Sequence, residues 1–211
     1  SAHHPMWAME YSRDEGLRKY WDEYSYPYHK EGAGPLYRGK DASDYNHNQD
    51  MLAVENIRRW FDYWQERPGT GTRISSGGVK IIFSDTNTHF RGEENYRRSG
   101  VTDAMRIPKD AFYAHQVMWD GWVDIEQPRI HIIGHWNYKE DVIKPVYVVS
   151  GADKVELFLN GKSLGEGERE YHFLYTFKDV QFETGKLEAI GYDETGKECC
   201  RTELQTAGKP E

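Results

Sequence analysis

The chain has 211 residues, enough for one large domain or two small ones, and its 27 basic against 35 acidic residues give a formal net charge of −8. This balance argues against a nucleic-acid partner, because binding to a phosphate backbone needs a basic face. No apolar run reaches 18 residues, so we expect no membrane span.

The first predicted element is a short strand that ends in a carboxylate. Residues 5–11, Pro-Met-Trp-Ala-Met-Glu-Tyr, place four mostly large apolar residues between a proline and Glu10. Such a run is typical of a strand that is buried on both faces. In an α/β barrel the carboxyl end of such a strand faces the substrate, which makes Glu10 a candidate nucleophile or proton carrier. The alternative is a surface glutamate after a core strand.

The next predicted elements are a helix, a strand and a second helix. Apolar residues recur at helical spacing over residues 50–66, and Pro68-Gly69 can end that helix. Residues 79–83 predict a strand, and Pro108 predicts the first residue of the second helix. The order strand, helix, strand, helix indicates the last βα units of an α/β barrel, over residues 1–124.

The second half, residues 128–211, predicts strands and turns only. Six or seven short strands at this spacing fit an all-β immunoglobulin-like sandwich. Asn160-Gly161 directly follows Val-Glu-Leu-Phe-Leu and predicts a two-residue hairpin turn. Cys199 and Cys200 are neighbours, so no disulfide framework is expected and the compartment stays open. No Cys-x-x-Cys or clustered histidine spacing occurs, and we expect no metal and no cofactor.

These segments together resemble family-2 glycoside hydrolases, the β-galactosidase-like enzymes. Residues 5–11 resemble the seventh-strand motif, in which a proline opens the strand and Glu-Tyr closes it. Residues 99–113, with Ile-Pro-Lys-Asp, resemble the segment that leads into the eighth helix, and residues 145–165 resemble the sandwich that follows the barrel. Residues 12–49 form an insertion. The family's eighth strand usually ends in tryptophan, where this sequence has residues 82–84, Ile-Phe-Ser.

The resemblance implies part of a retaining β-glycosidase that hydrolyses β-galactoside-type bonds of oligo- or polysaccharides. In that mechanism one carboxylate forms a glycosyl-enzyme and a second acts as acid and base. Carried over by motif, Glu10 is the nucleophile. The family's acid/base glutamate follows an asparagine, and no Asn-Glu dipeptide occurs here. We therefore expect that residue in an upstream part of the same polypeptide, and we expect this chain alone to be inactive.

Several other residues are candidates for the site. Asp44 is the second candidate nucleophile, because an acidic-Tyr-x-His run also leads into the helix at residue 50. Substrate contacts are expected from residues after the eighth strand and from aromatic residues of the insertion, which would cover the barrel mouth. These residues are Asp85, Asn87, His89, Tyr26, Tyr28 and His29. Alternatively, Leu17, Tyr20, Trp21 and Tyr24 form the inner stripe of a short helix in the insertion.

A second hypothesis is a non-catalytic carbohydrate-binding or structural module, because the sandwich half alone shows no acidic pair. In either case the expected partner is a carbohydrate, and a homo-oligomer remains open. We expect a periplasmic or secreted rather than a cytoplasmic location, although no secretion signal opens the sequence.

Overall fold

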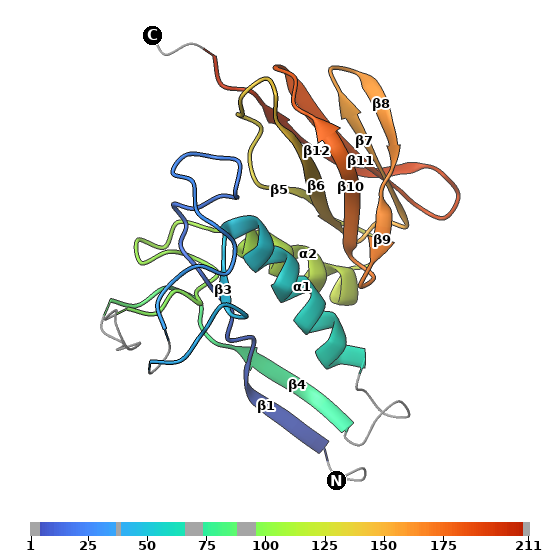
Figure 1. Cartoon of the computed structure of the whole chain (residues 1–211). Helices are drawn as coiled ribbons and strands as arrows, with labels where there is room; N and C mark the ends of the chain where they lie inside the picture. The colour runs from blue at the N-terminus through green and yellow to red at the C-terminus, as the bar shows by residue number, and fades with distance from the viewer. Residues whose placement is uncertain (1–4, 37–38, 66–73, 88–95, 209–211) are drawn as a thin grey trace.

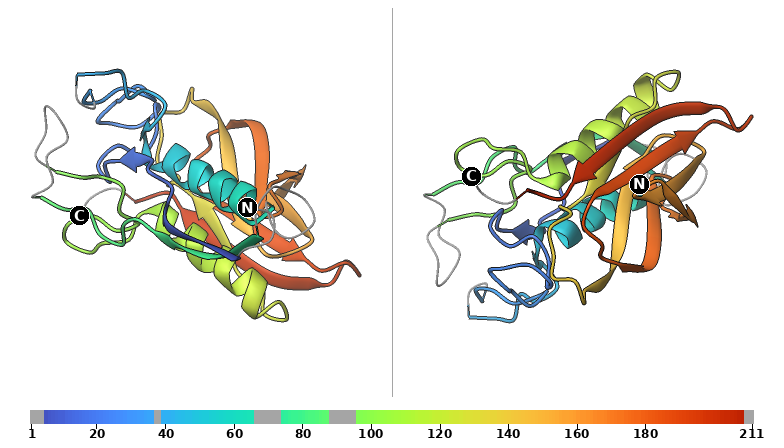
Figure 2. Two further views of the ribbon diagram at one scale, coloured as in Figure 1. Left: turned by 90° about the horizontal axis from the view of Figure 1, so that it is seen from below. Right: turned by 90° about the horizontal axis from the view of Figure 1, so that it is seen from above.

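The computed structural model describes residues 5–36, 39–65, 74–87 and 96–208. Two helices lie between a pair of parallel strands and a β-sandwich (Figure 1). Figure 2 shows the same arrangement from below and from above, with α2 running alongside the sandwich. Most of the ordered elements are therefore strands, as the sequence patterns of the second half predict.

The first half contains the strand and helix order that the sequence predicts. Strand β1 (Pro5–Tyr11) pairs in parallel with β4 (Ile74–Lys80), and the helices are α1 (Gln49–Gln65) and α2 (Asp110–Val123). Two residue pairs in the insertion, β2 (Glu15–Gly16) and β3 (Asn46–His47), add a short parallel contact. Strand β1 covers the run of residues 5–11 that the sequence predicts, and α1 begins one residue earlier than predicted. The predicted end at residue 66 and the Pro68-Gly69 stop lie outside the described residues.

The prediction for the next strand is wrong at both ends. Residues 79–83 were expected to form it, whereas β4 runs from Ile74 to Lys80 because Gly77 and Gly78 pair with Trp7 and Ala8 of β1. Beyond Lys80 the chain exchanges partners: the Val101 and Thr102 amides donate to the carbonyl oxygens of Ile82 and Phe83. The peptide bond between Ile81 and Ile82 is cis.

The second helix also begins later than expected. Pro108 is not its first residue, because it forms a backbone bridge with Thr102 and the Lys109 amide donates to the Val101 carbonyl. Lys109 keeps an extended backbone (φ −95°, ψ 168°), and the helix starts at Asp110.

The sandwich consists of two four-stranded antiparallel sheets. One has the order β5-β6-β10-β9 and the other the order β12-β11-β7-β8. The strands are β5 (Ile130–Ile133), β6 (Ile143–Ser150), β7 (Lys154–Leu159), β8 (Lys162–Glu166), β9 (Glu168–Glu170), β10 (Leu174–Gln181), β11 (Lys186–Tyr192) and β12 (Glu198–Gln205). The charged strand β9 was not predicted, because Glu-Arg-Glu carries no apolar alternation.

Two apolar clusters form the core. One fills the sandwich, and Tyr175, Leu157 and Leu187 contribute to it from different strands. The other joins the helices to the sandwich, because Ile57 and Met118 share it with Phe173. The helical part and the sandwich therefore bury each other's apolar surface.

The insertion is held by polar contacts rather than by a helix. No helix occurs over residues 12–36 or 39–48, so the predicted helical stripe of Leu17 to Tyr24 is wrong. Asp22 is buried, and its carboxylate accepts bonds from the Tyr24 amide (2.9 Å), the Ser25 hydroxyl (2.6 Å) and the Tyr138 hydroxyl (2.6 Å). These bonds close a turn and attach it to the sandwich.

Candidate active site

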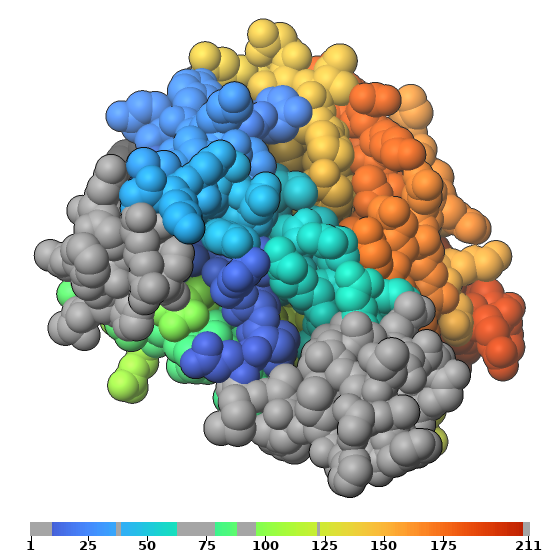
Figure 3. Space-filling model, turned by 60° about the horizontal axis from the view of Figure 1, so that its bottom comes forward, coloured from blue at the N-terminus to red at the C-terminus, as the bar shows by residue number. Residues whose placement is uncertain are grey.

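Glu10 lies at the carboxyl-terminal edge of the parallel strand pair. It is the last residue but one of β1, its side chain is exposed, and its neighbour Tyr11 pairs with Lys80 at the end of β4. Because the two strands are parallel, they end at the same edge, and the residues after both approach one place. Figure 3 shows the segment that follows Glu10, in dark blue, at the surface beside α1.

A cavity of about 270 Å³ lies beside Glu10. Its wall also contains Tyr11, Ser12, Arg13, Arg59 and Ile81. The Arg13 side chain is exposed, and its guanidinium carbon lies 4.1 Å from the centre of the Tyr45 ring. The cavity therefore combines one exposed carboxylate with positive charge.

The backbone turns sharply after Glu10. Ser12 has a positive φ of 59°, and its hydroxyl lies within hydrogen-bonding distance of Asp14 Oδ2 (3.0 Å) and Asn56 Oδ1 (3.3 Å). Asp14 is fully buried and forms an ion pair with Arg59 of α1 (2.5 Å). Burial alone would raise the pKa of Asp14, but hydrogen bonds from His47 and Arg59 lower it to about 2. Asp14 is therefore an anion that fixes this turn to α1.

His47 connects that turn to the insertion. Its Nε2 lies 3.2 Å from Asp14 Oδ1, and its Nδ1 forms a short bond with Glu31. The other oxygen of Glu31 accepts the Asn48 amide (2.7 Å). Burial opposes the charged imidazolium, but the hydrogen bonds to Asp14 and Glu31 outweigh it and raise the pKa of His47 to about 9. A cation between two carboxylates thus holds the insertion against the strand end.

Asp85, a predicted substrate contact, lies near this edge, but its carboxylate accepts hydrogen bonds from within the protein. Its Oδ1 accepts the Lys109 ammonium (2.9 Å) and the Gly100 amide (2.9 Å). Burial raises the pKa of Asp85, while the charge of Lys109 opposes that rise. Lys109 also donates to the Gly16 and Arg98 carbonyl oxygens, so Asp85 belongs to a buried cluster under the strand ends.

The remaining candidates on this side differ in position. Asn87 is exposed. Asp44 is exposed in a turn, in which the Tyr45 amide donates to the Ala42 carbonyl. Unlike Glu10, it does not lie at the end of a strand. His89 lies outside the described residues.

The aromatic candidates of the insertion lie beside the sandwich. Tyr26 is 85 % exposed and Tyr28 is 56 % exposed, and the Lys139 ammonium lies 5.6 Å from the centre of the Tyr28 ring. His29 makes contacts within the insertion: its Nδ1 donates to Asn48 Oδ1 (2.8 Å), and its ring stacks on Tyr20. The structure therefore places Glu10 beside the cavity and Asp85 in an internal ion pair, while Tyr28 lies beside Lys139 and Tyr26 contacts Tyr28 edge to face.

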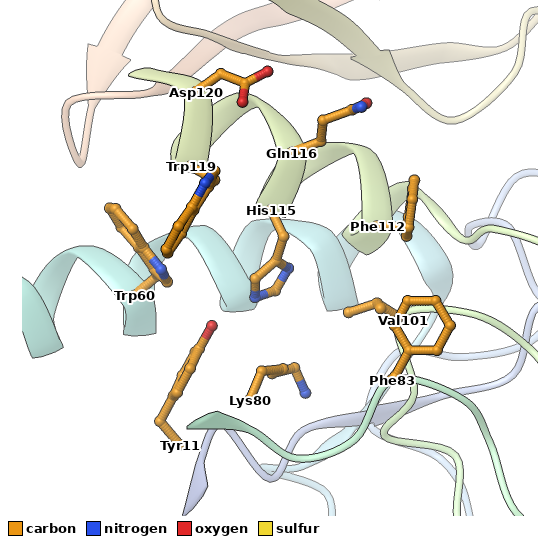
Figure 4. A pocket seen from close by; sticks show the side chains of 10 residues that line it. All are labelled: Tyr11, Trp60, Lys80, Phe83, Val101, Phe112, His115, Gln116, Trp119 and Asp120. Carbon is orange, nitrogen blue, oxygen red and sulfur yellow. The ribbon is translucent and has the colours of Figure 1, made fainter. Parts of the chain in front are cut away.

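A larger and mostly apolar cavity of about 410 Å³ lies between the strand pair and the helices (Figure 4). His115 points from α2 toward Tyr11 and Lys80; Trp60 and Trp119 lie on one side of it, and Phe83 and Phe112 lie on the other. Burial and the nearby Lys80 lower the pKa of His115 to about 4, and its Nδ1 donates to the Ala111 carbonyl (2.7 Å). His115 is thus neutral, and its Nε2 is buried without a hydrogen-bond partner among the described residues.

The buried charges were not predicted as site residues. Lys80 interrupts a run of strand-forming residues, which is the signal that could have identified it, whereas nothing local marks Asp14 or His47 as buried. In the part of the chain that the structure describes, no cluster of three or more His, Cys, Asp or Glu side chains could hold a metal ion. Within the same residues, no helix has the length and apolar character needed to cross a membrane.

Comparison with known protein families gives one match. A domain of unknown function, DUF4982, matches residues 141–200, which cover β6 to β11 and part of β12.

Comparison with characterised sequences gives glycosidases. A β-glucuronidase from Formosa agariphila is 34 % identical over 98 % of this chain and 20 % of its own length. A β-galactosidase from Bacteroides ovatus is 34 % identical over 53 % of this chain and 12 % of its own length. The chain thus spans about a fifth or less of these relatives.

Comparison with solved structures also gives glycosidases. The structure of a β-glucuronidase from glycoside hydrolase family 2 matches with a TM-score of 0.76 and 30 % identity, over 97 % of this chain and 20 % of that protein. The likeness therefore extends over both the helical part and the sandwich.

Proposed function

Because the chain belongs to glycoside hydrolase family 2, we propose that it supplies the nucleophile, Glu10, of a retaining β-glycosidase that acts on β-glucuronides. The observation that carries this proposal is the exposed carboxylate of Glu10 beside a cavity at the carboxyl end of a parallel strand. Active sites of α/β barrels are built at that end of the strands.

The proposed barrel rests on the order of elements. β1, α1, β4 and α2 follow one another as two βα units, and both helices lie on one side of the parallel strand pair (Figure 1). A parallel sheet is normally buried on both faces, and two strands cannot close a barrel. In this proposal the other strands come from the remainder of the parent polypeptide, and the immunoglobulin-like sandwich follows the barrel.

The proposed reaction has two steps. The Glu10 carboxylate attacks the anomeric carbon while the bond to the leaving oxygen breaks, and a second carboxyl group protonates that oxygen. The second group lies roughly 5–5.5 Å from the nucleophile in retaining enzymes and would come from the rest of the polypeptide. It then takes a proton from water, which attacks the anomeric carbon and releases Glu10.

The proposed substrate differs from the β-galactoside expected from the sequence. The two relatives of at least 30 % identity that match 97–98 % of the chain are β-glucuronidases, whereas the β-galactosidase from Bacteroides ovatus matches 53 % of it. Arg13 supports this choice, because an exposed guanidinium beside Glu10 can pair with the carboxylate of a uronic acid.

The test uses the parent polypeptide that contains this chain. Replacing the covalent nucleophile closes the two-step route, so Glu10→Gln should lower turnover of a nitrophenyl β-glucuronide by several orders of magnitude. Azide should partly restore the Glu10→Gly variant and give a product of inverted configuration. A nitrophenyl β-galactoside, assayed alongside, should be the poorer substrate.

Asp44→Asn is the matched control and should keep near-normal turnover. The reverse result, with Glu10→Gln active and Asp44→Asn inactive, would contradict the assignment of Glu10. A parent without a second catalytic carboxyl group would favour the non-catalytic module instead.

A further inference from the structure

Two ammonium groups, from the half-buried Lys80 and the buried Lys109, bridge the same two backbone segments below the end of β1. Lys80 Nζ donates to the carbonyl oxygens of Ser12 (3.4 Å) and Ser99 (3.0 Å). Lys109 Nζ donates to the carbonyl oxygens of Gly16 (2.7 Å) and Arg98 (3.0 Å). Residues 12–16 and 98–99 are thus joined twice in parallel, by side chains from β4 and from the start of α2.

The two lysines differ in their third contact. Lys109 pairs with the Asp85 carboxylate, whereas Lys80 donates to its neighbour's carbonyl, Ile81 O (2.9 Å). Among the described residues, no carboxylate lies within ion-pair distance of Lys80. Burial lowers the pKa of Lys80 to about 7, and the charge of Lys109 adds to that effect, while Asp14 and Asp85 oppose it. Burying such a cation costs free energy, so its retention needs an explanation beyond stability.

The position of Lys80 gives that explanation. Its backbone pairs with Tyr11, and its ammonium reaches Ser12, so it contacts both residues that follow Glu10. Ser12 has a positive φ, and both Ser12 and Arg13 line the cavity beside Glu10. The ammonium therefore fixes the peptide groups on which the direction of the Glu10 side chain depends.

We propose that Lys80 is a positioning residue, whose hydrogen bonds to the backbone after β1 and to Ser99 hold Glu10 in its reactive position. This inference rests on the proposed function of Glu10. Lys109 anchors the same segments farther along the chain, at Gly16. A displacement of about 1 Å in a reacting group can lower a rate about 100-fold, so a loosened turn should affect the chemical step more than substrate binding.

The test compares Lys80→Met with Lys144→Met in the parent polypeptide. Lys144 is a buried lysine that lies in β6 next to Asp22 and Pro145. Each variant is labelled with an activated 2-deoxy-2-fluoro β-glycoside of the sugar that the parent hydrolyses. The first-order rate constant of labelling is independent of the folded fraction, so it separates positioning from lost stability.

Lys80→Met should lower that rate constant by about 10- to 100-fold, with little change in the inhibitor concentration that gives half-maximal rate. Hydrogen–deuterium exchange should become faster in residues 11–17 and 97–101. Lys144→Met should lower the melting temperature and leave both readouts unchanged.

Unchanged labelling and unchanged exchange in Lys80→Met would overturn the inference, as would an equal loss of the labelling rate in both variants. Glu10→Gln separates this failure from that of the proposed function. If Glu10→Gln is still labelled, Glu10 is not the nucleophile and both proposals fall. If Glu10→Gln is not labelled and Lys80→Met labels normally, only the role of Lys80 is wrong.

Discussion

At the scale of single residues, His47 shows how the fold changes the chemistry of a side chain. The sequence places it in an acidic-Tyr-x-His run that marked Asp44 as a candidate. In the structure it is 9 % exposed and lies between Asp14 and Glu31, which come from the start and the middle of the insertion. The proton on His47 is therefore part of what holds the insertion in place.

The stability of the chain should depend on that proton. The pKa of His47 rises from 6.5 to about 9 on folding, so its contribution is complete below pH 6.5 and is lost as the pH rises to about 9. Across this range the contribution is about 3 kcal/mol or less. We would measure the free energy of unfolding in urea at pH 6, 7.5 and 9. Its decrease with rising pH should be smaller in His47→Gln than in the wild type.

Lys80 acts in the opposite direction, because its lowered pKa makes folding more favourable as the pH rises above 7. The difference between wild type and His47→Gln therefore isolates the histidine. Asp14→Asn removes one carboxylate partner of His47. In that background, the difference in pH dependence that His47→Gln causes should therefore be smaller. Parallel pH curves for wild type and His47→Gln would show that His47 is not protonated by folding.

At the scale of elements, the hairpin between β7 and β8 confirms a local prediction. Asn160 (φ 52°) and Gly161 (φ 81°) form the turn, and Leu159 pairs with Lys162 across it. The Asn160 side chain also donates to the Thr184 carbonyl and accepts the Lys186 amide. The turn thus supports a second loop, which the hairpin pattern did not predict.

Gly161→Val should destabilise the chain by about 1–3 kcal/mol, the range for strained backbone positions. A Cβ atom at Gly161 would meet no atom within 4 Å, so the cost comes from the positive φ alone. Urea unfolding measures the change, with Lys162→Val in the exposed strand β8 as a near-neutral control. The parent's affinity for sugar should not change; a loss of affinity at unchanged stability would mean that the sandwich reaches the active site.

At the scale of the whole molecule, one apolar cluster connects the helices to the sandwich. Phe173 is fully buried, contacts Trp60 of α1 edge to face, and lies so close to Gly121 of α2 that an added Cβ would come within 2.5 Å of its ring. Because both parts bury the same side chain, we expect them to unfold together.

Phe173→Ala should destabilise the chain by about 3–5 kcal/mol, as for other buried aromatic residues. Tryptophan fluorescence and circular dichroism should follow one shared transition, before and after the substitution. Phe182→Ala, in the other cluster, is the matched control and should shift the same transition. Two separate transitions, of which Phe173→Ala moves only one, would show that the helical part and the sandwich unfold independently.

The sequence alone determined the features that depend on neighbouring residues. A continuous apolar run predicts β1, helical spacing predicts α1 and turn residues predict the Asn160-Gly161 hairpin, because the physical causes lie within a few positions of each other. The resemblance added the family and assigned the role of nucleophile to Glu10. The place of the insertion and the roles of Lys80, Lys109 and His47 were decided only by tertiary structure. Their bonds join residues far apart in the chain, such as Lys109 and Gly16, which are separated by 93 positions. Whether a charged side chain is solvated or buried with partners depends on what the fold brings beside it, and no local pattern contains that information.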